Sequence, residues 1–276
     1  MTTSADAPAL ARVMFEACPL CDAAAFEAGP SWDVTAHPLF VPGMDPRQRW
    51  RRCLGCGHVF TEGYWPPEVL AQIFAGPHPG QMPGDGDVEH DRQVWAPIVE
   101  RLHELGAPRP GRWLDVGFGN GALMTTAEEF GDQVVGLDLR AEVVERMRGW
   151  GYDARCATLE ATAFEQPFDV VVLADVLEHT PHPGAMIAAA ARAVAPGGLL
   201  FVSTPNLDSF AFRMLSPDAH PYWGEIEHFH GFGRERLYDL LASHGLEAIH
   251  YAISQRYVAC MEVVARRAGS HPTNTA

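Results

Sequence analysis

Leu114-Asp115-Val116-Gly117-Phe118-Gly119-Asn120-Gly121 is the stretch that decides the fold, and it lies between the apolar run Trp113–Val116 and the amphipathic segment Ala122–Glu129. This pattern predicts a buried strand, a tight turn and a helix, because glycine allows bends and close backbone approaches that a Cβ would block. The free N–H groups at such a helix start form an electropositive pocket. The next expected strand, Gln133–Asp138, ends on an acid that can accept both hydroxyls of an adenosine ribose. The sequence therefore predicts a site for an adenosine-containing cofactor.

The glycine turn alone is compatible with more than one cofactor of this kind. Gly117, Gly119 and Ala122 also satisfy the looser dinucleotide pattern G-x-G-x-x-G/A, which is weak as a single match. Asp115 argues against a nicotinamide dinucleotide, because a carboxylate two residues before the first glycine suits a cationic amino acid better than a pyrophosphate.

Two further segments follow the glycine turn in order. Residues 168–179 are an apolar strand that runs into an acidic helix start, and residues 195–202 are a helix stop, a turn and another buried strand. Together with the glycine turn, this series resembles the class I S-adenosylmethionine-dependent methyltransferases, from about Val88 to Arg267. The resemblance implies an α/β, Rossmann-like methyltransferase fold with a mostly parallel seven-stranded sheet and an antiparallel last strand.

The resemblance also implies roles for residues of the cofactor site. Gly117, Gly119 and Gly121 would wrap the methionine part of S-adenosylmethionine, Asp115 would hold its amino group, and Asp138 would hold the ribose. Residues just after the third strand are placed to touch adenine, and the alternative is that they form an ordinary loop. The residues expected to bind the cofactor are Asp115, Gly117, Phe118, Gly119, Gly121, Asp138, Leu139, Thr158, Leu159 and Ala174.

Strand and helix patterns alternate through the rest of this region. A helix from about His90 to Leu105 opens it, and two late strands, Glu247–Ile253 and Tyr257–Ala265, close it. Such alternation implies a mostly parallel sheet with helices on both faces and a ligand crevice at the carboxyl ends of the strands. We expect this domain to cover residues 87–268, followed by a disordered tail at 269–276.

Four of the six cysteines form two C-x₂-C pairs, Cys18 with Cys21 and Cys53 with Cys56. Paired knuckles of this kind suit one zinc ion held by four thiolates, and a reducing cytoplasm disfavours disulfides. Such a site is structural, because four sulfur ligands leave no position open for substrate. The alternative is four unconnected structural cysteines. We place a zinc-ribbon-like module and a linker in residues 1–86, and we expect residues 22–46, between the two pairs, to be irregular.

Asp175, Glu178 and His179 are the first candidates for the chemistry, because their spacing would put them on one face of a helical turn. This run resembles the E-x-x-E-H segment of ubiquinone-biosynthesis O-methyltransferases, for which a divalent cation is implied, although Asp175 replaces the first glutamate. The alternative is that Glu178 and His179 orient loops around the cofactor.

A long segment after the fifth strand, residues 205–232, supplies the second candidate. It interleaves polar and aromatic side chains, as small-molecule pockets do. His228 is the first choice for a general base or a substrate-orienting group, since a neutral imidazole can accept a proton near pH 7. The alternative is that His228 only supports the loop.

Composition narrows the expected partners. The chain has 35 acidic and 20 basic residues and a formal net charge of −15, which argues against nucleic-acid binding. The arginines of residues 47–52 are expected to lie on a solvated strand face. The N-terminal residues lack the basic-then-apolar pattern of a signal peptide, and no apolar stretch is long and uninterrupted enough to span a bilayer. We therefore expect a cytoplasmic protein without a membrane partner.

These features predict a transferase that moves a methyl group from S-adenosylmethionine to a small molecule, with oxygen favoured as the acceptor atom. Transfer to carbon or nitrogen of a biosynthetic intermediate is one alternative. A non-catalytic cofactor-binding module and a nicotinamide-dependent reductase are the others.

Overall fold

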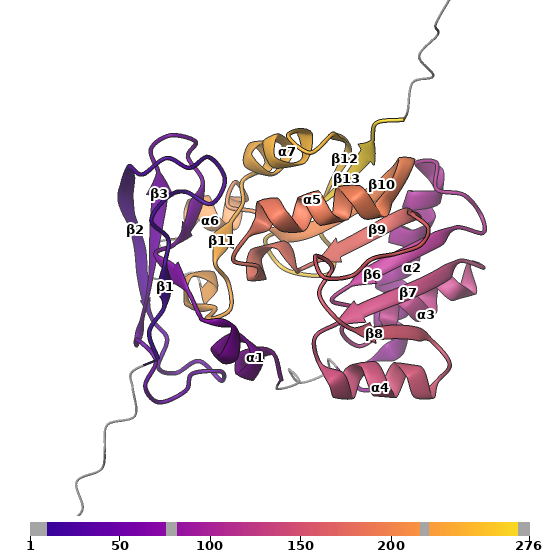
Figure 1. Cartoon of the computed structure of the whole chain (residues 1–276), viewed down its shortest axis with the longest axis horizontal. Helices are drawn as coiled ribbons and strands as arrows, with labels where there is room; N and C mark the ends of the chain where they lie inside the picture. The colour runs from indigo at the N-terminus through magenta and orange to yellow at the C-terminus, as the bar shows by residue number, and fades with distance from the viewer. Residues whose placement is uncertain (1–9, 76–81, 216–220, 270–276) are drawn as a thin grey trace, which may run out of the picture.

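The structure, a computed structural model, describes residues 10–75, 82–215 and 221–269 of the chain. Within these residues the strands form a seven-stranded, a four-stranded and a two-stranded sheet. Figure 1 shows the large sheet with helices on both faces and the N-terminal strands set to one side of it. The expected disordered tail lies, except for Gly269, outside the described residues, as does the 76–81 part of the expected linker.

The large sheet has the strand order β12-β13-β10-β9-β6-β7-β8. Its strands are β6 (Arg112–Val116), β7 (Gln133–Asp138), β8 (Asp153–Cys156), β9 (Phe168–Ala174), β10 (Val194–Pro205), β12 (Leu246–Ile253) and β13 (Cys260–Arg267). β13 runs antiparallel to both of its neighbours, whereas β8, β7, β6, β9 and β10 pair in parallel. The expected methyltransferase-type fold is therefore confirmed.

Helices cover both faces of this sheet, and alternate residues of β9 show why. Val171 and Leu173 face one hydrophobic cluster, and Val170 and Val172 face another. Strands buried on both sides read as continuous apolar runs, which is typical of parallel sheets. The helices are α2 (Val88–Glu104), α3 (Ala122–Glu129), α4 (Ala141–Gly149), α5 (Pro183–Ala193) and α7 (Arg234–Ala242).

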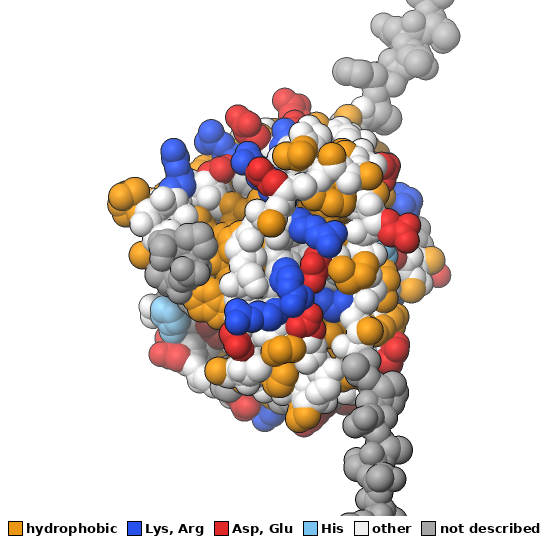
Figure 2. Space-filling view, turned by 90° about the vertical axis from the view of Figure 1, so that its left-hand side faces the viewer, with side chains coloured by type: hydrophobic (Ala, Val, Ile, Leu, Met, Phe, Trp, Pro, Cys, Tyr) orange, Lys and Arg blue, Asp and Glu red, His pale blue; other side chains and the backbone are white. Residues whose placement is uncertain are grey.

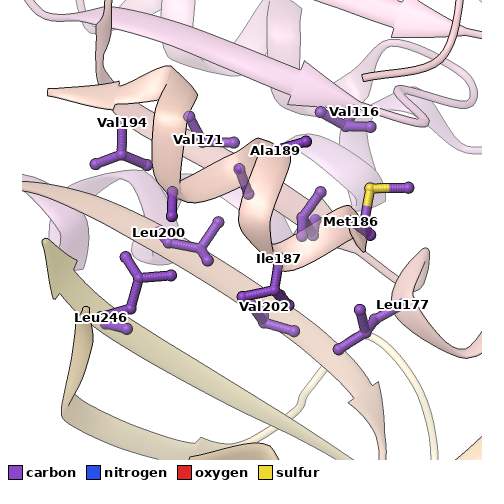
Figure 3. Close-up of a cluster of buried hydrophobic side chains, with 14 of the residues drawn as sticks. Val116, Val171, Leu177, Met186, Ile187, Ala189, Val194, Leu200, Val202 and Leu246 are labelled. Carbon is purple, nitrogen blue, oxygen red and sulfur yellow. The ribbon is translucent and has the colours of Figure 1, made fainter. Parts of the chain in front are cut away.

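Four of these helices contribute side chains to the two clusters, with one pair of helices on each face of the sheet. Side chains of α5 and α7 pack on the first face, and side chains of α2 and α3 pack on the second. Figure 3 shows Ile187 and Met186 of α5 above Val202 and other strand residues of the first cluster. None of the described helices is both long and apolar enough to cross a bilayer.

The direction in which successive strands are added to the sheet reverses between β6 and β9. From β6 the chain proceeds outward to β7 and β8, and then returns to β9 on the other side of β6. The helices after neighbouring strands diverge at such a reversal, which opens a crevice at the carboxyl ends of the strands. The glycine turn after β6 lies at this crevice.

The N-terminal residues form a separate small unit. Its elements are β1 (Val13–Met14), β2 (Phe26–Asp33), β3 (Arg47–Cys53), β4 (Val59–Thr61), β5 (Gly63–Tyr64) and α1 (Pro67–Ala75). The prediction that residues 22–46 are irregular was wrong, because β2 lies within them. β2 is an edge strand whose pairing with β3 shifts between Ala28 and Ser31, where Gly29-Pro30 interrupts the strand pattern.

Arginines of the N-terminal unit lie beside acidic residues on its exposed side. Arg49 pairs with Asp45 at 2.7 Å and with Glu62 at 3.0 Å, and Arg51, on the same strand face, pairs with Glu62 at 3.4 Å. Figure 2, which views the molecule from this side, shows basic side chains next to acidic ones. This is the solvated strand face that the sequence predicted.

The four-stranded sheet contains one strand from far along the chain. β11 (His230–Gly231) follows β10 and the short helix α6 (Phe210–Met214), and it pairs with β4 in the order β11-β4-β3-β2. The segment around it, residues 221–232, also packs Ile226 and Phe229 against α1. The N-terminal unit and the large sheet are thus joined by the segment that carries His228.

Candidate active site

The glycine turn after β6 has the backbone that the sequence requires. Gly117, Gly119 and Gly121 have φ values of +70°, +58° and +76°. A Cβ on Gly117 would lie 2.8 Å from Val176, and one on Gly121 would lie 2.7 Å from Met147. A Cβ on Gly119 would meet no heavy atom closer than 3.9 Å. The turn is therefore packed against protein at both ends and open at Gly119, where a ligand can approach the backbone.

Asp115 lies in β6 below this turn, and it is 3% exposed. Burial raises the pKa of Asp115 to about 7, although the positive charge of Arg256 acts against that rise. A buried carboxyl in this state favours a cationic partner, because a nearby positive charge stabilises the ionised form. Asp115 can therefore hold an ammonium group that enters the crevice.

Asp138, the expected ribose acid at the end of β7, already has protein partners. The backbone N–H of Gly119 donates to its carboxylate at 3.2 Å. Arg140 donates from its backbone N–H at 2.9 Å and from its guanidinium at 2.9 and 2.8 Å. The Arg140 side chain therefore has to turn away before the carboxylate can accept ribose hydroxyls.

The remaining expected cofactor residues differ in how far their side chains are exposed. Leu139 is 54% exposed and Thr158 is exposed, so both are accessible beside the crevice. Ala174 is partly buried at the end of β9. Phe118 and Leu159 are 5% and 3% exposed and pack into hydrophobic clusters, which places these two side chains in the core.

Asp175 does not lie on the helical turn that carries Glu178 and His179, the two residues with which it was grouped. It has a φ of +55°, and the 3₁₀ helix Leu177–His179 begins only after it. Ser203 donates a hydrogen bond to its carboxylate at 2.9 Å, and Arg256 pairs with it at 2.9 Å. The prediction that Asp175 shares a helix face with Glu178 and His179 was wrong, because the left-handed residue turns its side chain towards β10.

Glu178 and His179 instead lie beside His228. One possible ligand atom from each of the three residues lies within 4.8 Å of the other two. The rings of His179 and His228 are 4.6 Å apart between centroids, in an edge-to-face arrangement. The backbone N–H of Phe229 donates to the Glu178 carbonyl at 2.8 Å, which fixes residues 221–232 against the 3₁₀ helix.

Glu178 is buried and hydrogen-bonded. The Thr204 hydroxyl donates to its carboxylate at 3.0 Å, and the residue is 1% exposed. Burial, with the nearby charge of Asp175, raises the pKa of Glu178 well above its ordinary value. Thr204 has no motif of its own, and the only signal for it in the sequence is its place at the end of a predicted strand.

A second cluster lies where the N-terminal unit meets the same segment. His37 Nε2 is 3.2 Å from a Glu225 carboxylate oxygen and 3.8 Å from one of Glu227. Glu227 is 5% exposed, and burial raises its pKa. Sequence reasoning missed this cluster, because His37 lies far from the two glutamates in the chain and belongs to no motif.

The four cysteines of the N-terminal unit come together. The sulfurs of Cys18 and Cys56 are 3.7 Å apart, and those of Cys21 and Cys53 are 3.5 Å apart. All four lie within 4.8 Å of one another. Four thiolates around a zinc ion at about 2.3 Å have sulfur–sulfur distances of about 3.8 Å. The donor set therefore fits a tetrahedral zinc site.

Sequence comparison matches the part of the chain that forms the large sheet to a known protein family. Residues 88–251 match a protein-family model described as a methyltransferase domain. A ubiquinone biosynthesis O-methyltransferase of Xanthomonas euvesicatoria pv. vesicatoria is 41% identical over 125 residues, which cover 42% of this chain and 51% of that protein. The enzyme of the same name from Burkholderia cenocepacia is 34% identical over 167 residues, or 52% of this chain and 70% of that protein. The chain thus spans about half the length of the first of these relatives.

Structural comparison shows the same fold at low sequence identity. The Burkholderia thailandensis 1,6-didemethyltoxoflavin-N1-methyltransferase, solved with 1,6-didemethyltoxoflavin and S-adenosylhomocysteine, has a TM-score of 0.55 at 20% identity, over 78% of this chain and 97% of that one. The magnesium protoporphyrin IX methyltransferase of Synechocystis PCC 6803, with bound S-adenosylhomocysteine, has a TM-score of 0.54 at 19% identity, over 67% of this chain and 90% of that one.

Proposed function

The chain belongs to the methyltransferase-domain family, and on that premise we propose that it transfers a methyl group from S-adenosylmethionine to a small-molecule acceptor, with oxygen favoured as the acceptor atom. The observation that carries this proposal is the open backbone at Gly119, which lies in the turn after the strand of Asp115, donates a hydrogen bond to Asp138, and follows β6 at the chain reversal of the sheet. In this proposal Asp115 would hold the amino group of the cofactor, the Gly119 backbone would lie against its methionine arm, and Asp138 would hold its ribose.

The cofactor would lie along the carboxyl ends of three neighbouring strands. Its ribose would be held by Asp138 on β7, and its adenine would extend towards β8, beside Leu139 and Thr158. Its methionine arm would pass over Gly119 towards β6 and Asp115. Phe118 and Leu159 would support the site from within the core rather than contact the cofactor.

On the acceptor side, His228 would act as the general base. S-adenosylmethionine would supply a methyl group that is activated by its positively charged sulfur, and the His228 imidazole would take the proton of the acceptor hydroxyl as the methyl group moves to the oxygen. Because the sulfonium is already activated, much of the rate comes from aligning the oxygen, the methyl group and the sulfur. His179 would orient His228 through their edge-to-face contact, and Glu178 would hold this arrangement from below.

A divalent cation at the same residues is the second candidate for the chemistry. The close approach of Glu178, His179 and His228 favours it. One carboxylate and two imidazoles suit zinc, manganese or iron better than magnesium, which prefers oxygen ligands. A cation there would lower the pKa of an acceptor hydroxyl.

We also propose that Cys18, Cys21, Cys53 and Cys56 hold a structural zinc ion, and that the N-terminal unit supports the acceptor side. The support is direct: β11 pairs with β4, Trp50 Nε1 donates to the Trp223 carbonyl at 3.0 Å, and the Thr61 N–H donates to the Phe229 carbonyl at 2.9 Å.

Methyl transfer from S-adenosylmethionine with a labelled methyl group, into a protein-free bacterial small-molecule extract, tests the proposed reaction. We expect label in the extract with the wild-type protein. His228→Ala should lower the rate roughly 10²–10⁴-fold, the usual contribution of a general base, and leave the affinity for S-adenosylhomocysteine unchanged. The control His244→Ala alters a histidine at the end of α7 and should have no effect.

A chelator separates the two candidates for the chemistry. Loss of transfer on chelation and its return with manganese, while the cysteine site keeps its zinc, would support the cation. Full activity of His228→Ala together with indifference to chelator would contradict both candidates.

A further inference from the structure

Arg256 reaches the crevice from a part of the chain that no motif marks. It lies in the hairpin between β12 and β13, and its side chain is 12% exposed. Its guanidinium lies 4.0 Å from the ring centre of Trp95 in α2 and pairs with Asp175, just beyond the end of β9, at 2.9 Å. A hairpin at one side of the sheet thus places a cation over the central strands.

One donor of this guanidinium is unused. Nη1 of Arg256 is buried and has no hydrogen-bond partner among the described residues. A guanidinium carries five N–H groups in one plane, and its geometry matches the two oxygens of a carboxylate. Trp95 covers one flat face of the group, and the N–H groups lie in its plane, so a further hydrogen-bond partner approaches at its edge. A buried charged donor without a partner is costly, and an incoming anion would satisfy it.

The position of Arg256 relative to the proposed cofactor site indicates which anion this is. The ribose acid Asp138 ends β7, and the next strands are β6 and then β9. Neighbouring strands are about 4.8 Å apart, so β9 lies roughly 10 Å from β7, which the extended amino-acid arm of the cofactor can span. That arm ends in an ammonium and a carboxylate. Asp115 on β6 suits the first, and Arg256, which pairs with Asp175 just beyond the end of the neighbouring strand β9, suits the second.

We propose that Arg256 binds the carboxylate of the cofactor's methionine arm, while Asp115 binds the ammonium. This inference rests on the proposed function and adds a residue to its cofactor site. Asp175 is then a positioning residue, because it pairs with Nη2 of the guanidinium, and Ser203 in turn donates a hydrogen bond to the Asp175 carboxylate. The crevice would recognise a zwitterion with one acid and one base from different parts of the chain.

Two ligands that differ only in this arm test the assignment. S-adenosylhomocysteine carries the amino-acid arm, whereas 5′-methylthioadenosine keeps the adenosine and the thioether but lacks the arm's ammonium and carboxylate. Calorimetric titration of Arg256→Gln should show an affinity for S-adenosylhomocysteine that is about 10- to 100-fold weaker, the usual effect of losing a charge-assisted hydrogen bond. The affinity for 5′-methylthioadenosine should equal that of the wild type.

Two further variants sharpen the test. Arg256→Lys keeps the positive charge but lacks the planar guanidinium with its paired N–H donors. Its affinity for S-adenosylhomocysteine should therefore lie between those of the wild type and Arg256→Gln. Arg101→Gln removes an exposed arginine of α2 that pairs with Glu104, and it should change neither affinity.

Each other outcome has a clear meaning. An unchanged affinity of Arg256→Gln for S-adenosylhomocysteine would overturn the inference, as would an equal loss for both ligands, which would point to damage of the adenosine site. A wild-type protein that binds neither ligand would contradict the proposed function itself.

Discussion

Arg140 shows how one residue can close a binding site. Its guanidinium makes two hydrogen bonds to the carboxylate of Asp138, and the two side chains are 10% and 5% exposed. In the proposed complex the same carboxylate accepts ribose hydroxyls, so the ion pair and the cofactor compete. The cofactor's affinity therefore includes the cost of opening this pair.

Arg140→Ala should for this reason tighten the binding of S-adenosylhomocysteine. We expect a two- to fivefold lower dissociation constant, about 0.4–1 kcal/mol, because the ion pair no longer has to be opened when the cofactor binds. Calorimetric titration measures it, and Arg146→Ala, which alters an exposed arginine of the same helix, is the control. Weaker binding by Arg140→Ala would mean that the arginine contacts the cofactor.

At the scale of elements, the segment 221–232 depends on a buried glutamine of β3. Gln48 is fully buried, and its side-chain amide donates to the backbone carbonyls of Glu225 and His228. The N-terminal unit therefore fixes the backbone on which the proposed base is carried.

Gln48→Leu has a similar size but cannot donate these hydrogen bonds. It should lower the free energy of unfolding by about 1–3 kcal/mol, because the carbonyls of Glu225 and His228 lose a donor and the Arg12 guanidinium loses an acceptor, and it should reduce methyl transfer. The affinity for S-adenosylhomocysteine should stay at the wild-type value. Gln93→Leu, at an exposed site on α2, is the control for both measurements. Unchanged transfer by Gln48→Leu would show that the segment keeps its place without this contact.

Some strands could be predicted from the sequence and others could not. β6, β7 and β9 were predictable because strands buried on both faces are apolar throughout and helices separate them. β2 and β11 were not. Gly29-Pro30 interrupts the strand pattern of β2, where its register with β3 shifts, and β11 is only two residues long and pairs with β4, which lies far away in the chain.

The residues of the candidate site likewise divide into those that the sequence could predict and those that it could not. Asp115, Asp138 and the glycines could be proposed from the sequence because they lie in or directly after the ends of strands in a known order. Arg256 and His37 were missed because their positions depend on tertiary contacts alone. Asp175 was misplaced because a single left-handed residue breaks the helical spacing that its sequence suggests.

At the scale of the whole molecule, the chain has two groups of hydrophobic clusters that meet at one segment. Ile226 and Phe229 pack with the N-terminal unit, whereas Phe232 packs with α7 and the large sheet. The proposed zinc site stabilises the first group. Loss of zinc should therefore affect the acceptor side before it affects the cofactor site.

Cys53→Ser tests this expectation. Elemental analysis should find one zinc per chain in the wild type and less in the variant, whose thermal unfolding should begin at a lower temperature. Methyl transfer should fall more than the affinity for S-adenosylhomocysteine does. Cys260→Ser, at a buried cysteine of β13 outside the cluster, is the matched control for zinc content. A metal-free wild type of equal stability would contradict the zinc site.

Calorimetric titration of the wild type and of Asp138→Ala with S-adenosylhomocysteine and with NADH tests the central claim most directly. We predict binding of S-adenosylhomocysteine and none of NADH, and a loss of about 1.5–3 kcal/mol in Asp138→Ala, where charge-assisted hydrogen bonds to the ribose are removed. Binding of NADH without binding of S-adenosylhomocysteine, or an Asp138→Ala variant with wild-type affinity, would contradict it.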